Sequence, residues 1–165
     1  MVATITVYSG ALDSVADAVI STAEAKTNLG FLEATLRGLL CNVLVCLAIF
    51  MAFSAQTVSG KIWAIFGPVM LFVLCGFEHS VANIYYGPAG ILMTMRNGVA
   101  TDVTIGTFLI NNLLPVTLGN IIGGAGLVGC GFYLAYPHVS AKPEPMRPAE
   151  TSTTLADITN KLKIV

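Results

Sequence analysis

Charged side chains are scarce in this sequence of 165 residues, where Asp, Glu, Lys and Arg make up 10% and hydrophobic residues 55%. The mean hydropathy is +0.80. Soluble domains carry about 25% charged residues, so this composition excludes a water-soluble protein and predicts a membrane protein in contact with the lipid bilayer. The net charge is -1, whereas nucleic-acid-binding proteins have an excess of basic residues, so nucleic acid is not expected as a partner.

Cysteine is present, but its spacing lacks the pattern of a metal site. The four cysteines lie in apolar segments, and none belongs to a CxxC or Cys/His arrangement. We therefore expect them to be small packing residues, and the sequence indicates neither a metal nor a cofactor. The first residues, MVATITVYSGALDS, also lack the basic region of an ordinary secretory signal peptide. Later segments would have to direct membrane insertion.

Long apolar segments predict an all-α membrane protein with about three transmembrane helices. Residues 36–54 match the length of about 20 residues that a straight helix needs to cross the bilayer. Residues 62–95 contain no charged residue except the adjacent pair Glu78 and His79. They would make a helix of about 50 Å, which is too long for one crossing and too short for two. We therefore predict a broken helix with non-helical backbone around residues 76–83.

The third apolar segment, residues 106–136, is rich in glycine. Pro115 predicts a kink or a late helix start. Gly119 and Gly123 have the GxxxG spacing that lets another helix approach closely. A nucleotide-binding glycine loop is a poor alternative, because no strand precedes these glycines. We assign residues 36–136 as a whole to the transmembrane region.

The flanking segments are polar. Residues 9–35 predict a partly helical connector outside the membrane, and the proline-rich residues 137–165 predict a disordered tail. Three crossings would place these two segments on opposite sides. Lys and Arg are more numerous on the side of the tail, so the positive-inside rule places the tail in the cytoplasm and the connector on the extracytoplasmic side.

The presence of Glu78 and His79 in an apolar segment requires an explanation, because placing an ionisable residue at the membrane centre costs about 2.5–3.5 kcal/mol on insertion scales. In one interpretation both are buried, neutral and hydrogen-bonded to amides that the helix break exposes. In the other, His79 lines a cavity and exchanges protons. Phe72 precedes His79 by two helical turns on roughly the same face, and Asn42 and Asn83 can donate hydrogen bonds. The pattern favours a narrow path at His79, while for Glu78 a structural role remains equally open.

Three stretches carry a resemblance to a known family: GFEHSVAN at the predicted break, CNVLVCLAIFMAFSAQTVSGK before it and NNLLPVTLGNIIGGAGLVG after it. In this order and spacing they resemble the formate/nitrite transporter family over about residues 20–135. The resemblance implies an aquaporin-like fold of six transmembrane helices in an inverted repeat, with a broken fifth helix. It also implies a pentamer in the inner (cytoplasmic) membrane with one pore per protomer, and a transporter rather than an enzyme.

The resemblance further implies which residues form the substrate pathway. They are His79, Phe72, Asn42, Asn83, Glu78 and Lys26. His79 matches the central pore histidine and Phe72 a hydrophobic constriction beside it, while Glu78 and Asn83 match partners of the histidine within the break. Lys26 matches the vestibule lysine that attracts the anion. Asn42 matches an asparagine that forms a hydrogen bond near the histidine.

The chain departs from the family pattern at its start, where residues 1–8 are expected to be a remnant of the third helix. A truncated product, or a chain that pairs with a second copy, would explain this. The expected function is transport of a small monovalent anion such as formate or nitrite, together with protons. A non-transporting fragment or interaction subunit, packing through the glycine-rich residues 119–131, is the alternative. An intramembrane hydrolase that uses Glu78, His79 and Ser80 is disfavoured, since no oxyanion donors can be identified.

Overall fold

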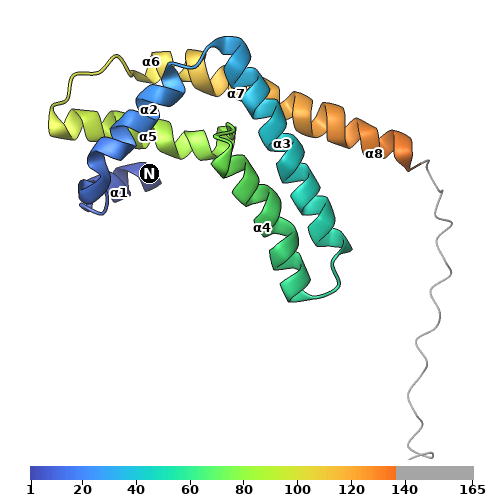
Figure 1. The fold of residues 1–165 in the computed structure, drawn as a ribbon. Coiled ribbons are helices and arrows are strands. Elements are labelled where there is room, and N and C mark those ends of the chain that lie inside the picture. The colour runs from blue at the N-terminus through green and yellow to red at the C-terminus, as the bar shows by residue number, and fades with distance from the viewer. Residues whose placement is uncertain (137–165) are drawn as a thin grey trace, which may run out of the picture. The chain divides into compact units, whose positions relative to one another are not determined.

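The chain folds into helices, and the computed structural model describes residues 1–136, within which no strand occurs. The first helices are α1 (Val2–Tyr8), a 3-10 turn (Asp13–Val15), α2 (Ala16–Thr27) and α3 (Phe31–Ser54). They are followed by α4 (Val58–Leu74) and α5 (Ser80–Asn97). The last helical stretch is formed by α6 (Ile105–Phe108), the π-helical η2 (Leu109–Leu113), α7 (Leu114–Ile121), the π-helical η3 (Ile122–Gly129) and α8 (Cys130–Ala135) (Figure 1). The predicted tail, residues 137–165, lies outside the described residues.

Two helical stretches are long and apolar enough to cross a bilayer. They are α3, which contains an 18-residue segment with a mean hydropathy of 2.2, and the last stretch, Ile105–Ala135, which contains one with a mean hydropathy of 1.6. α4 is apolar but shorter, and it runs back beside α3 after a short turn (Figure 1).

α3 begins at Phe31, before the start of the predicted membrane crossing, residues 36–54. Its first turns carry an ion pair in which Arg37 Nη2 lies 2.6 Å from Glu33 Oε1, with the i,i+4 spacing that stabilises a helix in water. The apolar pattern marks only the part of a helix suited to lipid. The predicted crossing therefore does not include these polar turns.

The break in the middle segment covers residues 75–79 and is shorter than the predicted 76–83. Gly76 has a φ of +63°, a left-handed conformation that glycine adopts without strain. His79 ends the break as the N-cap of α5, because its Nδ1 accepts a hydrogen bond from the backbone N–H of Val81 at 3.2 Å. This side-chain cap lets the helix start earlier than the length argument alone predicted.

Pro115 was predicted to cause either a kink or a late helix start. The last stretch is already helical from Ile105, so the helix does not start late. Its start is fixed by a capping box, in which Thr107 N donates to Thr104 Oγ1 at 3.2 Å. The π-helical η2 directly precedes Pro115. Proline lacks an N–H and its ring crowds the carbonyl four residues earlier, and a wider π turn makes room for it.

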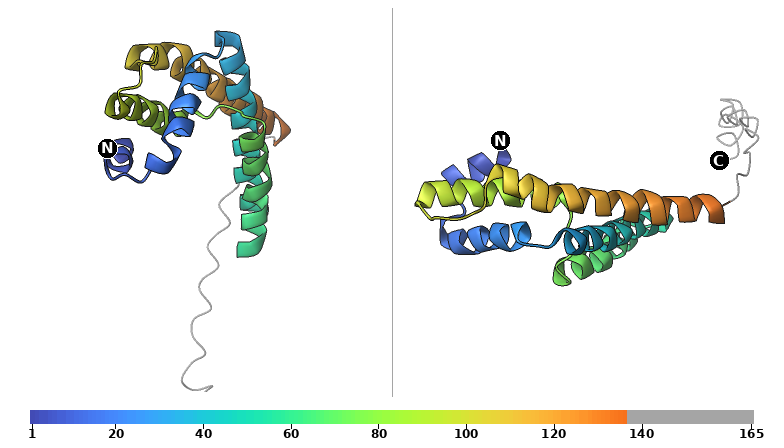
Figure 2. Two further views of the ribbon diagram at one scale, coloured as in Figure 1. Left: turned by 60° about the vertical axis from the view of Figure 1, so that its left-hand side comes forward. Right: turned by 90° about the horizontal axis from the view of Figure 1, so that it is seen from above.

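Glycine lets the last stretch approach α3 closely. An added Cβ at Gly119 would meet the backbone oxygen of Thr35, and one at Gly123 would meet that of Leu39, both on α3. The predicted GxxxG contact is thus made within the chain, and α3 runs beside α7 and η3 (Figures 1 and 2). Gly119 and Gly123 are therefore not free to receive a partner protein, which corrects that part of the interaction-subunit alternative.

A second contact places α1 and α2 on α5. Val7, Ile20 and Met93 are buried in the shared core. Arg96 near the end of α5 donates to Asp13 Oδ1 at 2.6 Å. This packing brings Lys26, in the last turn of α2, to the helix break.

Candidate functional site

A buried ionic cluster, made of Lys26, Glu78, Asn83 and Asn112, lies at the helix break. Glu78 is 4% exposed, and its carboxylate accepts from Lys26 Nζ at 2.8 Å and from Asn83 Nδ2 at 2.6 Å. Asn112 of η2 donates to Glu78 Oε2 at 3.3 Å and to the backbone oxygen of Lys26 at 3.0 Å. The carboxylate is thus neutralised by a cation and held by two amides, which offsets the cost of its desolvation.

The ionic cluster has one open acceptor. Asn83 Nδ2 donates to both Glu78 Oε2 and Asn112 Oδ1, the latter at 2.7 Å. Its Oδ1 is, in the part of the chain that the structure describes, the one buried side-chain nitrogen or oxygen without a hydrogen-bond partner. An acceptor left in this way costs about 1–3 kcal/mol, so the cluster could receive one further donor.

His79 has a different environment from Glu78, although the two are adjacent. Its Nδ1 accepts from the N–H of Val81. A ring nitrogen that accepts carries no proton, so the neutral imidazole holds its proton on Nε2 and can donate from there. The ring of Phe72 lies 6.3 Å from the His79 ring between centroids. An imidazole donor and an aromatic side chain therefore meet at the start of α5.

A groove of about 410 Å³ lies beside this imidazole. It is lined by small, polar and apolar residues of α3, the break, α5, α7 and η3: Asn42, Cys46, His79, Ser80, Val81, Thr117, Asn120, Ile121, Gly124 and Ala125. We call it the His79 groove. Asn42 Nδ2 donates to the backbone oxygen of Asn120 at 2.6 Å, which fixes the α3 side of the groove to α7. Imidazole, hydroxyl and amide groups beside apolar walls can replace part of the hydration shell of a small anion.

The structure separates the predicted pathway residues into two groups. Those at the His79 groove or beside its imidazole are His79, Asn42 and Phe72. Those in the ionic cluster are Lys26, Glu78 and Asn83. Glu78 and Asn83 were predicted as partners of the histidine within the break, and their side chains bond to Lys26, Asn112 and each other. Lys26, predicted as the vestibule lysine, forms an ion pair with Glu78 at 2.8 Å.

Asn112 and Asn120 were not predicted as site residues, and they are 0% and 5% exposed. Both lie in the long apolar stretch, where an unpaired polar group is costly. The cost of a polar group in an apolar segment, which marks Glu78 and His79 in the sequence, marks these two asparagines as well. Cys46, expected only to pack, lines the His79 groove.

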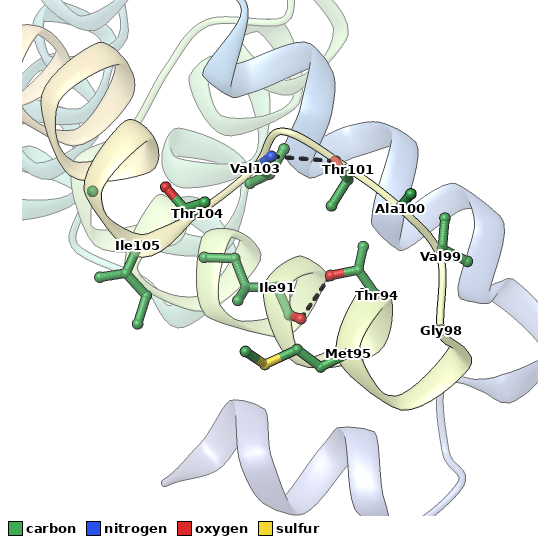
Figure 3. Close-up of a pocket in the computed structure, with 11 residues that line it drawn as sticks. Ile91, Thr94, Met95, Gly98, Val99, Ala100, Thr101, Val103, Thr104 and Ile105 are labelled. Carbon is green, nitrogen blue, oxygen red and sulfur yellow. Dashed lines mark hydrogen bonds between the residues drawn. The ribbon is translucent and has the colours of Figure 1, made fainter.

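A separate cavity of about 630 Å³ lies beneath the segment that joins α5 to α6 (Figure 3). Ile91, Met95 and Ile105 contribute apolar side chains, and Val103 N donates to Thr101 Oγ1 at 3.3 Å. This cavity shares no residue with the His79 groove and has no ionisable side chain in its lining. Within residues 1–136, no group of three or more His, Cys, Asp or Glu side chains could hold a metal ion.

Comparison with known proteins agrees with the motif resemblance. The family model described as formate/nitrite transporter matches residues 1–134. The formate channel FocA of Escherichia coli K12 is 38% identical over 130 residues, covering 72% of this chain and 46% of that protein. Formate-nitrite transporter 3 of Toxoplasma gondii is 34% identical over 138 residues, covering 83% of this chain and 26% of that protein. The chain thus spans about half or less of the length of these relatives.

Solved structures share the fold. A pentameric formate channel with formate bound aligns with a TM-score of 0.69 and 33% identity, covering 81% of this chain and 60% of that chain. A channel described as an FNT family ion channel aligns with a TM-score of 0.64 and 38% identity, covering 72% of this chain and 45% of that chain. The prediction of an all-α membrane fold is confirmed. Sequence motifs, family model and fold agree, and the chain belongs to the formate/nitrite transporter family.

Proposed function

We propose that this protein conducts small monovalent anions such as formate or nitrite across a membrane, through a pore to which the His79 groove contributes. The observation that carries the proposal is an imidazole at a helix break, beside a groove, in a chain of this family. One of the similar solved structures is a pentameric formate channel with formate bound.

The proposed mechanism lowers the cost of moving a charge through a narrow apolar path. An isolated carboxylate in a low-dielectric medium is very unfavourable, and neutralisation removes most of that cost. His79 would donate a hydrogen bond from Nε2, or a proton when it is charged, so that the species passing Phe72 is close to neutral. Asn42 holds the opposite wall of the groove through its bond to α7.

In this proposal the ionic cluster supports the pathway rather than attracting the anion. Lys26 compensates the carboxylate of Glu78, so Glu78 adds little negative potential next to His79. An uncompensated Glu78 would repel an approaching anion. Lys26 therefore favours anions by removing a repulsion.

We further propose a homo-oligomer, a pentamer as in the channel of known structure, in the inner (cytoplasmic) membrane. The chain crosses the membrane several times, and residues 137–165 lie on the cytoplasmic side. Native mass spectrometry of the purified chain tests the pentamer. Labelling of a cysteine introduced between residues 137 and 165, applied from either face of sealed vesicles, tests the orientation of the tail, because all four native cysteines lie before it.

The decisive experiment reconstitutes the full chain into liposomes and measures uptake of labelled formate. We expect uptake above that of protein-free liposomes, and loss of most of it in His79→Asn. A folded and inserted chain without uptake would refute the proposal for the chain by itself. Unchanged uptake and unchanged pH dependence in His79→Asn would remove His79 from the mechanism.

An interaction subunit that does not itself transport is the second candidate, and the exposure of α4 favours it. None of the residues of α4 is buried, and its Ile62, Trp63 and Phe66 are 61%, 71% and 51% exposed. Such a surface is suited to lipid or to another membrane helix. If the chain gives no uptake alone but does so with a longer product of the same locus, the second candidate is correct.

A further inference from the structure

Asn120 of α7 contacts the backbone on both sides of His79. Its Nδ2 donates to the backbone oxygen of Glu78 at 3.1 Å, and its Oδ1 accepts from the backbone N–H of Ser80 at 3.0 Å. The Glu78 carbonyl belongs to the peptide group that precedes His79, and the Ser80 N–H belongs to the one that follows it. One side-chain amide therefore holds both peptide groups that flank the imidazole.

These bonds matter because the break leaves backbone groups without helical partners. The N–H groups at the start of α5 have no acceptor within the helix, and the bilayer core offers no water to replace one. The Nδ1 of His79 satisfies Val81 N–H, and Asn120 Oδ1 satisfies Ser80 N–H and also accepts from Ser80 Oγ at 3.0 Å. Without Asn120 the Ser80 N–H and the Glu78 carbonyl would lose these partners, which loosens the backbone on both sides of the imidazole.

Asn120 is itself fixed by contacts with α3. Its Nδ2 also donates to the backbone oxygen of Gly38 at 2.8 Å, and its own backbone oxygen accepts from Asn42 Nδ2 at 2.6 Å. Gly38 permits this approach, because an added Cβ there would lie 2.6 Å from Val116 O. Asn120 is 5% exposed, so it has little room to adopt another rotamer.

We propose that Asn120 is a positioning residue for His79, which holds the imidazole in the groove by bonding the two peptide groups beside it. The proposal rests on the proposed function only for the consequence in transport. The chemistry requires an amide at this position, with a donor for two carbonyls and an acceptor for Ser80. Aspartate has the same shape but no donor, and its second oxygen would face the carbonyls of Glu78 and Gly38.

The main test records the imidazole nitrogen signals of His79 by solid-state NMR of the full chain in lipid bilayers. The sequence contains two histidines, so a His138→Gln background leaves His79 as the one labelled ring. We expect one set of signals in this background, and shifted or multiple sets in Asn120→Ala and Asn120→Asp. The matched control is Asn111→Ala on the same stretch, an exposed asparagine that should leave the signals unchanged.

Thermal stability separates positioning from a merely structural role. Asn120→Ala that lowers the midpoint of unfolding but leaves the His79 signals unchanged would overturn the proposal. Should the Asn120 variants not fold, the wild-type chain still tests it. Dipolar recoupling between the Asn120 side-chain nitrogen and the Glu78 carbonyl carbon should report hydrogen-bond proximity, and a longer separation would refute the proposal.

The transport readout separates this proposal from the proposed function. Where the chain takes up formate, Asn120→Asp should lower the maximal rate about tenfold or more, the scale of loss seen when a hydrogen-bond partner of a metal-binding histidine is removed. A variant with altered His79 signals and an unchanged rate would overturn the role in transport. A wild-type chain without uptake would bear on the proposed function alone, because the NMR signals do not depend on flux.

Discussion

The ionic cluster and the His79 groove start from adjacent residues and have opposite environments. Glu78 is 4% exposed within the chain and is held by a cation and two amides. His79 lines a groove of about 410 Å³ and uses one ring nitrogen as a helix cap. Both are ionisable residues at a helix break, yet only one is placed where a small solute could reach it.

The difference shows two ways of tolerating an ionisable residue in an apolar segment. A carboxylate that is buried as an anion needs a buried cation and hydrogen-bond donors. A residue that gains and loses a proton can instead remain beside a groove, because its neutral form is inexpensive to bury. The non-helical backbone at residues 75–79 separates the two side chains, so a structural and a functional group can occupy neighbouring positions.

The largest expected effect comes from removing the cation of the ionic cluster. Lys26→Met leaves Glu78 buried without its partner, which typically costs about 3–5 kcal/mol. The free energy of unfolding in detergent should fall by this amount, and Lys26→Met combined with Glu78→Gln should recover part of it. Lys61→Met, at an exposed lysine, is the control and should change stability by less than about 0.5 kcal/mol. If Lys26→Met lowers the free energy of unfolding no more than Lys61→Met does, the ionic cluster contributes little to stability.

A smaller effect is expected when the α3 wall of the groove is moved while the ionic cluster is left intact. Gly119→Ala places a Cβ against the Thr35 oxygen and 2.9 Å from the Leu39 nitrogen, so α3 and α7 must separate. Overpacking of this kind costs about 1–3 kcal/mol. Thermal unfolding measures the loss. Reactivity of Cys46 with a thiol reagent measures opening of the groove, in a background from which the exposed Cys75 and Cys130 have been removed.

Gly131→Ala is the matched control for that variant, since nothing lies within 4 Å of an added Cβ at that position. It should be neutral or slightly stabilising, because alanine favours a helix over glycine. A loss of stability in Gly131→Ala as large as that in Gly119→Ala would contradict the packing argument.

The smallest change in stability is expected at His79. In His79→Asn the new side chain can still cap α5, since asparagine is among the best N-cap residues. Unfolding should therefore shift by less than about 0.5 kcal/mol, whereas formate uptake should lose its dependence on pH between about 5 and 8. A large loss of stability would mean that the imidazole is mainly structural.

Much of the fold followed from local patterns in the sequence. Apolar length predicted α3 and the last stretch, and the excess length of residues 62–95 predicted a broken helix. These features depend on neighbouring residues, so the sequence is sufficient to find them. The errors were at the ends, where the Glu33–Arg37 pair and the His79 cap extend helices into positions that apolar length does not mark.

The partners of the site residues could not be predicted in the same way. Lys26 and Glu78 are separated by much of the chain, and their contact depends on α2 packing against α5. The sequence suggested that Lys26 faces an anion, and the structure pairs it with a carboxylate. Asn120 was missed because a single amide in an apolar helix reveals its partners only when α3 and the break are in place.

The sequence by itself determined that this is a helical membrane protein of the formate/nitrite transporter family with a histidine at a broken helix. Composition, apolar length and the GFEHSVAN motif are local properties that need no knowledge of the fold. Only the tertiary structure decided that Glu78 belongs to a closed ionic cluster and His79 to an open groove. The physical reason is that burial and charge pairing are set by helices that meet from distant parts of the chain.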